Sequence, residues 1–277
     1  MDQSLPPGLY IVATPIGNLS DLSPRAAATL RQAKLVLAED TRVSGKLLKH
    51  IGAKTPMRSY HDHTGDAERT AFVQRMGHEA IALISDAGTP LISDPGYKLV
   101  RAARDAGHPV HTIPGPSAAV AALSIAGLPT DRFFFLGFLP AKATARAATI
   151  GEIAEVRATL VFYETGPRLS EALVALAEGL GDRECAVARE LTKLHEECVV
   201  GSLSTLAGRF SDAPPKGEIV IIVAPPAEQP EASDNELDAA LDAALKHLSP
   251  SRAAAEVAEQ LGVKRKRAYA RALERMR

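Results

Sequence analysis

Short apolar runs that alternate with helical patterns constrain the fold of this chain more than any other feature. The runs lie at residues 9–13, 35–38, 80–84 and 109–113, with helical patterns between them. Strands that alternate with helices form parallel sheets, because a helix returns the chain to the edge from which the next strand starts. The pattern therefore predicts an α/β domain over residues 1–115.

Capping residues indicate where helices of this region begin. Ser23 and Asp94 each precede a proline, which is tolerated in the first turn of a helix. Asp66 precedes another amphipathic segment. We therefore expect these three residues to cap helices.

A second α/β domain is predicted over residues 116–224, since 277 residues suit two domains of medium size. Its strand candidates are residues 132–137, 159–163, 184–189, 197–200 and 218–223. The third and fourth of these lie too close together for a helical crossover. Part of the second sheet must therefore be antiparallel.

The composition excludes several classes of protein. Hydrophobic residues make up 46% of the chain and charged residues 23%, which excludes a wholly disordered protein. No apolar run approaches the roughly 20 residues of a membrane span, and no targeting signal is visible, so we expect a cytoplasmic protein without membrane contact. Cys185 and Cys198 cannot form a disulfide framework or a four-cysteine zinc site, and we expect both to be buried thiols.

The net charge of -1 hides an asymmetry along the chain. Residues 246–277 contain nine Lys or Arg and three Asp or Glu. The preceding stretch, residues 224–236, is rich in proline and acid and offers no apolar face to bury. We expect a solvated, acidic, proline-rich linker and the start of a helix over residues 225–245, and a separate basic segment over residues 246–277.

The basic segment has the spacing of a helix-turn-helix. Residues 249–261 form one amphipathic pattern, Gly262 offers a turn, and a basic run leads into a second helix. A basic run alone is nonspecific, but the glycine turn favours contact with nucleic acid. The cations that we expect to contact phosphates are Lys264, Arg265, Lys266 and Arg267.

Three strands of the first domain end in turns rich in glycine and proline. These turns are residues 14–17, residues 85–96 and the IPGPSAA run around Gly115 and Ser117. Glycine lets a backbone approach a ligand closely, and open α/β sheets bind ligands beyond the carboxyl ends of their strands. We interpret the three turns as contacts to one ligand, although each could be a plain turn and Ser117 a simple N-cap. None has the G-x-G-x-x-G pattern of a dinucleotide fold.

Charged loops supply further candidates. The EDTR and YHDH motifs place Asp40, Arg42, His61 and His63 in loops; the His-x-His pair lacks a clear third metal ligand, so we expect no metal. These residues could bind phosphate or form a surface ion-pair cluster. In the second domain, FYETGPRL and ARELTK bring charged residues to strand ends, where they either line the cleft between the domains or form salt bridges across it.

Taken together and in order, the motifs resemble those of a known family. They are LYIVATPIGNLSDLSPRA, AEDTR, HDH, SDAGTPLISDPG, PGPSA, GLPTDRFFFLGFLP, FYE, ARELTK and KGEIVIIV. Residues 8–224 are similar to the small-subunit ribosomal RNA methyltransferase I family of the tetrapyrrole methylase superfamily, and the tail resembles its variable helical extension. The resemblance implies S-adenosylmethionine as methyl donor, a donor cleft between two α/β domains, a homodimer, and 2'-O-methylation of a cytidine in the 16S rRNA of the 30S subunit.

The resemblance also implies which residues bind the donor. They are Pro15, Ile16, Ala87, Gly88, Thr89, Pro90, Ile92, Ser117, Ala118, Tyr163, Glu164 and Gly217. Pro167 stands where a histidine is common in the family. Candidate catalytic residues are Asp40, Arg42, His61, His63, Glu190 and Lys193, and the sequence leaves open whether one of these, Asp94 or Glu164 accepts the proton.

Two other functions fit parts of the pattern. A small-molecule methyltransferase of the tetrapyrrole type would share the α/β body, but the basic tail and the TPIGNL turn argue against it. A nucleic-acid-binding regulator without catalytic activity would use the tail to bind and the body to sense a ligand.

Overall fold

The computed structural model describes residues 4–227 and 232–275. The chain forms two compact units, residues 1–226 and residues 227–277. Within the described ranges, no helix is both long and apolar enough to cross a lipid bilayer.

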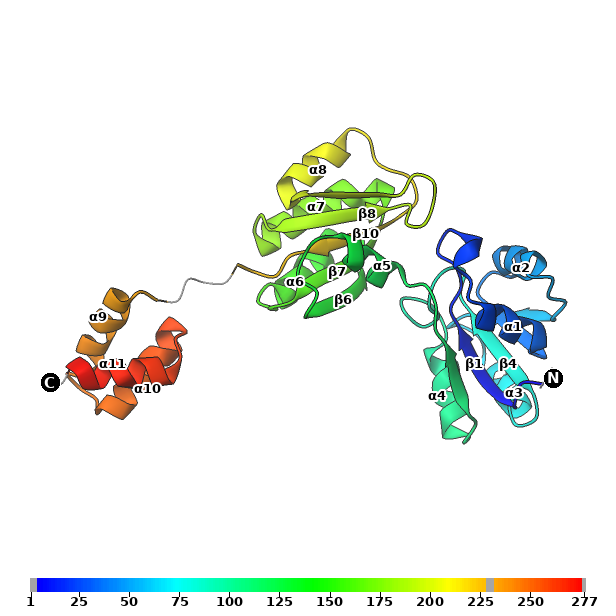
Figure 1. Ribbon diagram of the computed structural model, residues 1–277, viewed down its shortest axis with the longest axis horizontal. Helices are drawn as coiled ribbons and strands as arrows, with labels where there is room; N and C mark the ends of the chain where they lie inside the picture. Colours follow the sequence, from blue (N-terminus) through cyan, green and yellow to red (C-terminus); the bar gives the residue numbers. More distant parts are fainter. Residues whose placement is uncertain (1–3, 228–231, 276–277) are drawn as a thin grey trace. The chain divides into compact units, whose positions relative to one another are not determined.

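The first unit begins with a five-stranded sheet in which all neighbouring strands are parallel (Figure 1). In sheet order, the strands are β3 (Met57–Ser59), β2 (Leu35–Ala38), β4 (Ala80–Ile84), β1 (Gly8–Val12) and β5 (Val110–Ile113). The four apolar runs form β1, β2, β4 and β5, as predicted. The short edge strand β3 was missed because none of its residues is fully buried, so it has no apolar run.

Helices cover both faces of this sheet. After the short 3-10 helix η1 (Leu19–Asp21), α1 (Pro24–Gln32) and α2 (Thr41–His50) pack on the face that carries Tyr10 and Val12. The opposite face, which carries Leu9, is covered by α3 (Asp66–Arg75) and α4 (Tyr97–Asp105). Neighbouring residues of β1 thus point into two different cores, as expected for a strand buried on both faces.

One of the three predicted caps is confirmed and two are wrong. Ser23 caps α1, because its hydroxyl accepts a hydrogen bond from the backbone N–H of Ala26 at 3.1 Å. Gly65 is the N-cap of α3, so Asp66 lies inside the first turn. Gly96 is the N-cap of α4, and Asp94 instead faces a cavity.

The second sheet of the first unit is mixed. In sheet order, its strands are β6 (Phe133–Phe138), β7 (Thr159–Thr165), β10 (Glu218–Val223), β8 (Glu184–Arg189) and β9 (Glu197–Ser202). Only β6 and β7 are parallel to each other, and β8 and β9 form the predicted antiparallel pair. Cys185 on β8 is buried as predicted, whereas Cys198 on the edge strand β9 is only partly buried.

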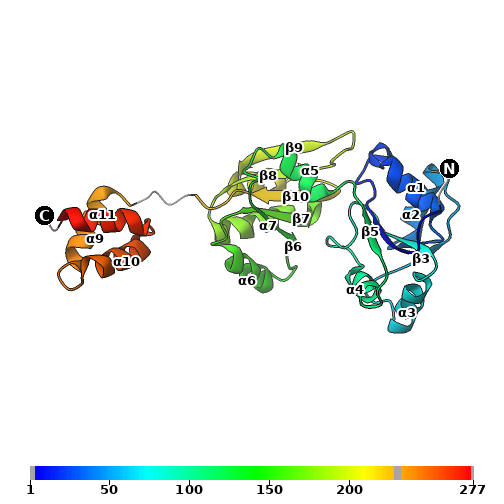
Figure 2. The same cartoon turned by 60° about the horizontal axis from the view of Figure 1, so that its bottom comes forward.

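Helices also cover both faces of the second sheet. One face packs against α6 (Ala143–Ile153), α7 (Gly166–Leu180) and α8 (Leu203–Ser211). The other packs against α5 (Ala118–Ile125), which lies beside β10 (Figure 2). Since α5 directly follows the last turn of the first sheet, its N-terminus connects the two sheets.

The second unit consists of α9 (Asp234–Ala244), α10 (Pro250–Leu261) and α11 (Arg265–Arg275), which share a core around Leu241 and Val257. Gly262 adopts a left-handed conformation with φ 64° between α10 and α11, as the predicted helix-turn-helix requires. A helix does start within residues 225–245, as predicted, but it starts inside the proline- and acid-rich stretch 224–236. Ser233 and Glu236 form a capping box, so α9 starts two residues before the predicted linker stretch ends at Glu236.

Ion pairs link α9 to α11. They are Arg267 with Asp234 at 2.8 Å, Arg271 with Asp238 at 2.7 Å, and Arg275 with Asp242. Residues spaced by four lie on one face of a helix, so both helices present matching rows of charge. Counted over residues 227–277, nine Lys or Arg are balanced by nine Asp or Glu. The basic asymmetry of the sequence is therefore largely offset by α9.

Candidate active site

The carboxyl ends of β4, β1 and β5 lie side by side, because these strands are neighbours in the first sheet. Thr14 after β1 and Gly88 after β4 exchange two backbone hydrogen bonds, with N···O distances of 2.8 and 3.1 Å. The hydroxyl of Thr89 donates to the carbonyl oxygen of Pro116, which follows β5, at 3.1 Å. The three turns rich in glycine and proline thus form one connected surface, as the sequence predicted.

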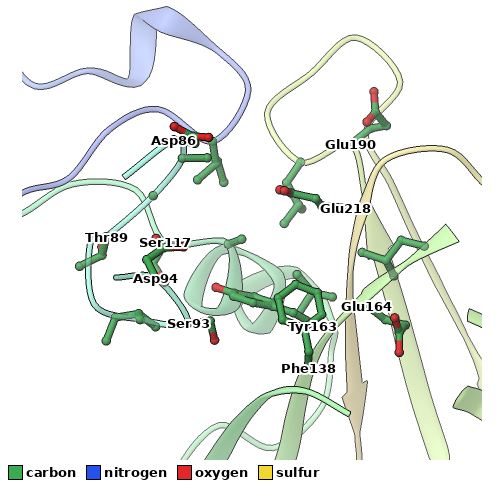
Figure 3. Close-up of a pocket in the computed structure, with 18 of the residues that line it drawn as sticks. Asp86, Thr89, Ser93, Asp94, Ser117, Phe138, Tyr163, Glu164, Glu190 and Glu218 are labelled. Carbon is green, nitrogen blue, oxygen red and sulfur yellow. The ribbon is translucent and has the colours of Figure 1, made fainter. Parts of the chain in front are cut away.

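A cavity opens on this surface, and its opposite wall comes from the second sheet (Figure 3). We call it the carboxylate cavity. Six acidic residues line it: Glu39, Asp86, Asp94, Glu164, Glu190 and Glu218. Among its described lining residues, Lys193 is the one Lys or Arg, and it pairs with Glu190 at 3.0 Å.

The acidic side chains perturb one another. Burial raises the pKa of Glu39, and the nearby charges of Asp94 and Asp86 raise it further. Burial also raises the pKa of Asp94; Glu218 and Asp86 add to this rise, while a hydrogen bond from Ser85 opposes it. Like charges held close together at a partly buried site destabilise their ionised forms. A cation in the cavity would relieve this repulsion.

An aromatic wall closes one side of the cavity (Figure 3). The rings of Phe138 and Tyr163 meet edge to face with centroids 5.7 Å apart, and Phe135 packs on Tyr163 from another side at 4.9 Å. Burial raises the pKa of Tyr163, and hydrogen bonds from Ser117 and the backbone of Ala119 oppose the rise. Tyr163 thus contacts the start of α5 from the second sheet.

The loop between β8 and β9 contacts the turn after β1. A Cβ atom at Gly17 would lie 2.7 and 2.8 Å from Cγ and Cε of Lys193, and 3.0 Å from the carbonyl oxygen of Leu191. Only glycine leaves room for the lysine stem at this position. Glu190 and Thr192 in the same loop have φ values of 49° and 64°, a conformation that costs energy for residues with side chains. The loop is therefore held in a strained form over the cavity.

Most residues predicted to bind the donor line the carboxylate cavity. Those that line it are Ile16, Ala87, Gly88, Thr89, Ile92, Ser117, Ala118, Tyr163 and Glu164. Pro15, Pro90 and Gly217 do not line it, although Gly217 lies directly before Glu218 and close to the carboxylate of Glu190. The roles of all twelve stay predictions.

The predicted catalytic residues fall into three groups rather than one site. Glu190 and Lys193 line the carboxylate cavity, whereas Asp40, Arg42, His61 and His63 do not. The guanidinium of Arg42 lies 2.6 Å from Asp40 and lowers the pKa of that carboxyl to about 2, so Asp40 is a poor proton acceptor. The two histidines line a separate hollow at the end of β3.

The sequence-based site omitted several residues that line the cavity. They are Ser93, Phe138, Leu191, Glu218, Ile219 and Val220, together with Glu39 and Asp86, which lie inside the EDTR motif and the predicted ligand turn of residues 85–96 but were not assigned to the site. Glu39 opens the EDTR motif, Asp86 opens the DAGTP run, and Glu218 follows Gly217. Their position next to motif residues was the signal in the sequence that could have identified these three as site residues.

Comparisons with known proteins agree along nearly the whole chain. A family model described as Tetrapyrrole (Corrin/Porphyrin) Methylases matches residues 8–207, and one described as RsmI C-terminal HTH domain matches residues 231–276. A protein of Erythrobacter litoralis named Ribosomal RNA small subunit methyltransferase I is 54% identical over 98% of this chain and 96% of its own length. The chain belongs to the ribosomal RNA small subunit methyltransferase I family. Proteins of the same name from Xylella fastidiosa and Pseudomonas aeruginosa are 48% and 46% identical, each over 96% of this chain and over 99% and 97% of their own lengths.

Solved structures share the fold of the first unit. Diphthine synthase aligns with a TM-score of 0.61 and 15% identity, covering 78% of this chain and 89% of its own. Uroporphyrin-III C-methyltransferase from Thermus thermophilus, complexed with S-adenosylhomocysteine, aligns with a TM-score of 0.54 and 20% identity, covering 78% of this chain and 97% of its own. At these identities the likeness establishes the fold alone.

Proposed function

We propose that this chain transfers a methyl group from S-adenosylmethionine to ribosomal RNA of the small subunit. Family membership supports the reaction, since the relatives that match almost the whole chain carry the name of a ribosomal RNA small subunit methyltransferase. The observation that carries the proposal for this chain's own residues is the carboxylate cavity at the ends of β4, β1 and β5.

The residues present fit this donor. S-Adenosylmethionine has a positively charged sulfonium, an ammonium group, ribose hydroxyls and an adenine. Six carboxylates line the cavity; Glu164 pairs with Arg168 and Glu190 with Lys193, and the other four suit a cation. Burial and the neighbouring acids raise the pKa values of Glu39 and Asp94, and a cation would oppose this rise. The aromatic wall of Phe138 and Tyr163 offers a flat apolar surface, which suits a base.

The donor, when bound, supplies a methyl group that is already reactive toward nucleophiles. The main task of the chain is therefore placement: an acceptor oxygen held in line at about 3–3.5 Å from the methyl carbon gains much of the roughly 7–11 kcal/mol that orientation can supply. The two walls of the cavity, which come from the two sheets and meet at Gly17 and Lys193, would hold the donor and the acceptor in register.

We assign proton acceptance to Asp94. A carboxylate with a raised pKa is a stronger base at neutral pH than an ordinary one, and a base adds about 10²- to 10⁴-fold to the rate. Asp94 lines the cavity and feels the charges of Glu218 and Asp86. The pair of Glu190 and Lys193 would position the β8–β9 loop over the donor.

The finer features are proposals that rest on the family. The acceptor is the 2'-oxygen of cytidine 1402 in 16S rRNA, within the 30S subunit. The active form is a homodimer, and the reaction takes place in the cytoplasm.

We further propose that the start of α11 and the residue before it contact the RNA through Lys264, Arg265 and Lys266. Among the described residues, no carboxylate forms an ion pair with any of these three, whereas Arg267 pairs with Asp234. The three cations therefore retain a charge that can attract phosphates, and binding should weaken steeply with salt. We assign Arg267 to the stability of the three-helix unit rather than to RNA contact.

A methyl-transfer assay tests the proposed function. The full chain is incubated with 30S subunits and donor labelled in its methyl group, and the rRNA is then digested to nucleosides. The proposal predicts label in 2'-O-methylcytidine and its loss from Asp94→Asn. The melting temperature of that variant should not fall, because the change removes a carboxylate whose ionisation the fold resists. A chain that binds donor and RNA but transfers no methyl group would instead be a ligand sensor, and label in a small tetrapyrrole but not in rRNA would favour the other branch of the superfamily.

A further inference from the structure

A second hollow lies at the carboxyl end of β3, apart from the carboxylate cavity. It is lined by Arg58, Ser59, His61, His63, Thr64, Gly65 and Glu68. Three of these side chains are basic and two carry hydroxyls, whereas Glu68 is the one acid among them. The proposed function gives this group no role.

Hydrogen bonds hold the walls of the hollow in a fixed form. The backbone N–H of Thr64 donates to the carbonyl oxygen of His61 at 2.9 Å, and the backbone N–H of His61 donates to the hydroxyl of Thr64 at 2.9 Å. Ser59 Oγ and His61 Nε2 lie 2.6 Å apart in a hydrogen bond. Arg69 donates to the carbonyl oxygen of Thr64 at 3.3 Å. The loop is thus organised before any ligand arrives, which lowers the entropy cost of binding.

The hollow offers hydrogen-bond donors that suit an anion, with Arg58 as the one Lys or Arg among its described lining residues. Among residues 4–227 and 232–275, no carboxylate forms an ion pair with Arg58. Two acidic residues close to the hollow in the sequence already have partners. Asp62 accepts a hydrogen bond from the backbone N–H of Gly96 at 3.3 Å, and Asp66 forms an ion pair with Arg69. The guanidinium of Arg58 and the imidazole of His63 are donors of the kind that bind a phosphate.

A metal ion is a poorer fit. Within the part of the chain that the structure describes, no three His, Cys, Asp or Glu residues come together in a way that could hold a metal.

The hollow and the carboxylate cavity both lie at the carboxyl ends of the strands of the first sheet. The hollow follows β3, Glu39 of the cavity follows β2, and Asp86 follows β4, which are adjacent strands in that order. With strands about 4.8 Å apart, the end of β3 is roughly 10 Å from the end of β4. Ser59 also donates its hydroxyl to the carbonyl oxygen of Glu39 at 3.3 Å, which joins the two places directly.

The charge of the cavity makes a neighbouring anion site favourable for an RNA substrate. Two of the six carboxylates, Glu164 and Glu190, are paired with Arg168 and Lys193. The other four attract a cationic donor but repel a polyanionic strand, so a cationic contact close to the nucleotide that enters would favour binding of the strand. We propose that the hollow at the end of β3 binds a backbone phosphodiester of the RNA next to the methylated nucleotide. This inference rests on the proposed function.

Binding of RNA at several salt concentrations tests the inference. The full chain is compared with Arg58→Gln, with Glu68→Gln, and with Arg104→Gln as a matched control. Arg104 is an exposed arginine in the last turn of α4 and lines neither the hollow nor the cavity. Its variant changes the net charge by the same amount as Arg58→Gln. The ligand is the RNA, naked or in the 30S subunit, that the wild-type chain methylates.

We expect Arg58→Gln to lose affinity several-fold and to flatten the slope of log affinity against log salt by about 0.7–0.9, the amount for one phosphate contact. Glu68→Gln should change affinity in the opposite direction, because it removes a like charge, and Arg104→Gln should match the wild type. Donor affinity should stay the same in all three.

Slopes for Arg58→Gln and Glu68→Gln that equal that of Arg104→Gln would overturn the inference and leave the proposed function intact. Wild-type chain that neither binds nor methylates RNA would overturn the proposed function itself. Arg58 and Glu68 are both exposed, so the two variants should fold, and their opposite effects on affinity distinguish a charge effect from general damage.

Discussion

Replacement of Gly166 by alanine should displace the segment that leads to Glu218 in the wall of the carboxylate cavity. Gly166 is the first residue of α7, and a Cβ atom there would lie 1.5 Å from the carbonyl oxygen and 2.7 Å from the carbonyl carbon of Pro215. Both atoms belong to the backbone, so no side-chain rotation can relieve the overlap. The segment that carries Pro215 leads two residues later to Gly217 and then to Glu218 in the cavity wall.

The size of the effect follows from these distances. Contacts of a Cβ atom below 3.0 Å are essentially not seen, so α7 and the Pro215 segment must separate by roughly 1.5 Å. Overpacking of a core costs about 1–3 kcal/mol, and an overlap of two backbone segments belongs at the upper end. For a unit of this size, about 3 kcal/mol lowers the melting temperature by roughly 6–12 °C. A shift of about 1 Å at reacting groups can also cost about 10²-fold in rate.

Differential scanning calorimetry and the methyl-transfer assay measure both effects. Gly151→Ala is the matched control, because Gly151 lies inside α6 with no atom within 4 Å of its added Cβ. That variant should be more stable by about 0.5–1 kcal/mol, since alanine loses less backbone entropy than glycine in a helix. A Gly166→Ala chain with the melting temperature and the activity of the wild type would refute this account of the cavity wall.

Three further predictions concern charge. First, the pKa values of Glu39 and Asp94 are raised above their ordinary values of 4.5 and 3.8, so the free energy of unfolding should fall as pH rises from the ordinary through the raised values, because the folded chain resists ionisation. A cationic donor favours ionisation, so the increase in melting temperature caused by S-adenosylmethionine should grow over this pH range. An increase that stays constant with pH would contradict the prediction. Second, the double variant Lys264→Gln/Lys266→Gln should raise the KM for RNA at unchanged donor affinity and melting temperature. Arg271→Gln should instead lower the thermal stability of the three-helix unit, because it breaks the ion pair with Asp238. Identical effects of the two variants would argue against separate roles. Third, Glu190→Gln should weaken donor binding measured by calorimetry, since it removes a charge from the cavity and the partner of Lys193; unchanged affinity would exclude the loop from the donor site.

The sequence predicted the first sheet well because its strands are buried on both faces. Runs such as residues 35–38 and 80–84 are entirely apolar over the length of a strand. β3 gave no such signal, since it lies at the sheet edge. The cap at Asp94 was wrong for a related reason: Asp-Pro is typical of a helix start, but the helix begins later and the carboxylate takes part in the cavity.

The candidate site was predicted only in part. The turns after β1, β4 and β5 could be grouped because the chain order of strands and helices predicts a common edge. The acidic character of the cavity could not be foreseen, because Glu39, Asp86 and Glu218 come from three different segments and only the sheet order brings them together. Conversely, the sequence made Asp40 and the two histidines catalytic candidates, although none of them lines the carboxylate cavity. The histidines follow the edge strand β3, outside the strands whose ends form the cavity.

The tail shows the limit of counting charges along a sequence. Nine Lys or Arg in residues 246–277 suggested a strongly basic segment, but three of them face a row of aspartates on α9. Those aspartates lie at positions 234, 238 and 242, before the basic stretch begins, so their effect appears only when α9 and α11 pack together.

Calorimetric titration with S-adenosylmethionine tests the central claim most directly. The wild-type chain and the Asp86→Asn/Asp94→Asn variant are titrated just above the ordinary pKa range of carboxyl groups, in two buffers with different ionisation enthalpies. If the carboxylate cavity binds the cationic donor, the wild type takes up one donor per chain and releases protons, and the variant binds at least tenfold more weakly with less proton release. Equal affinity of the two chains, or no uptake by the wild type, would contradict the claim.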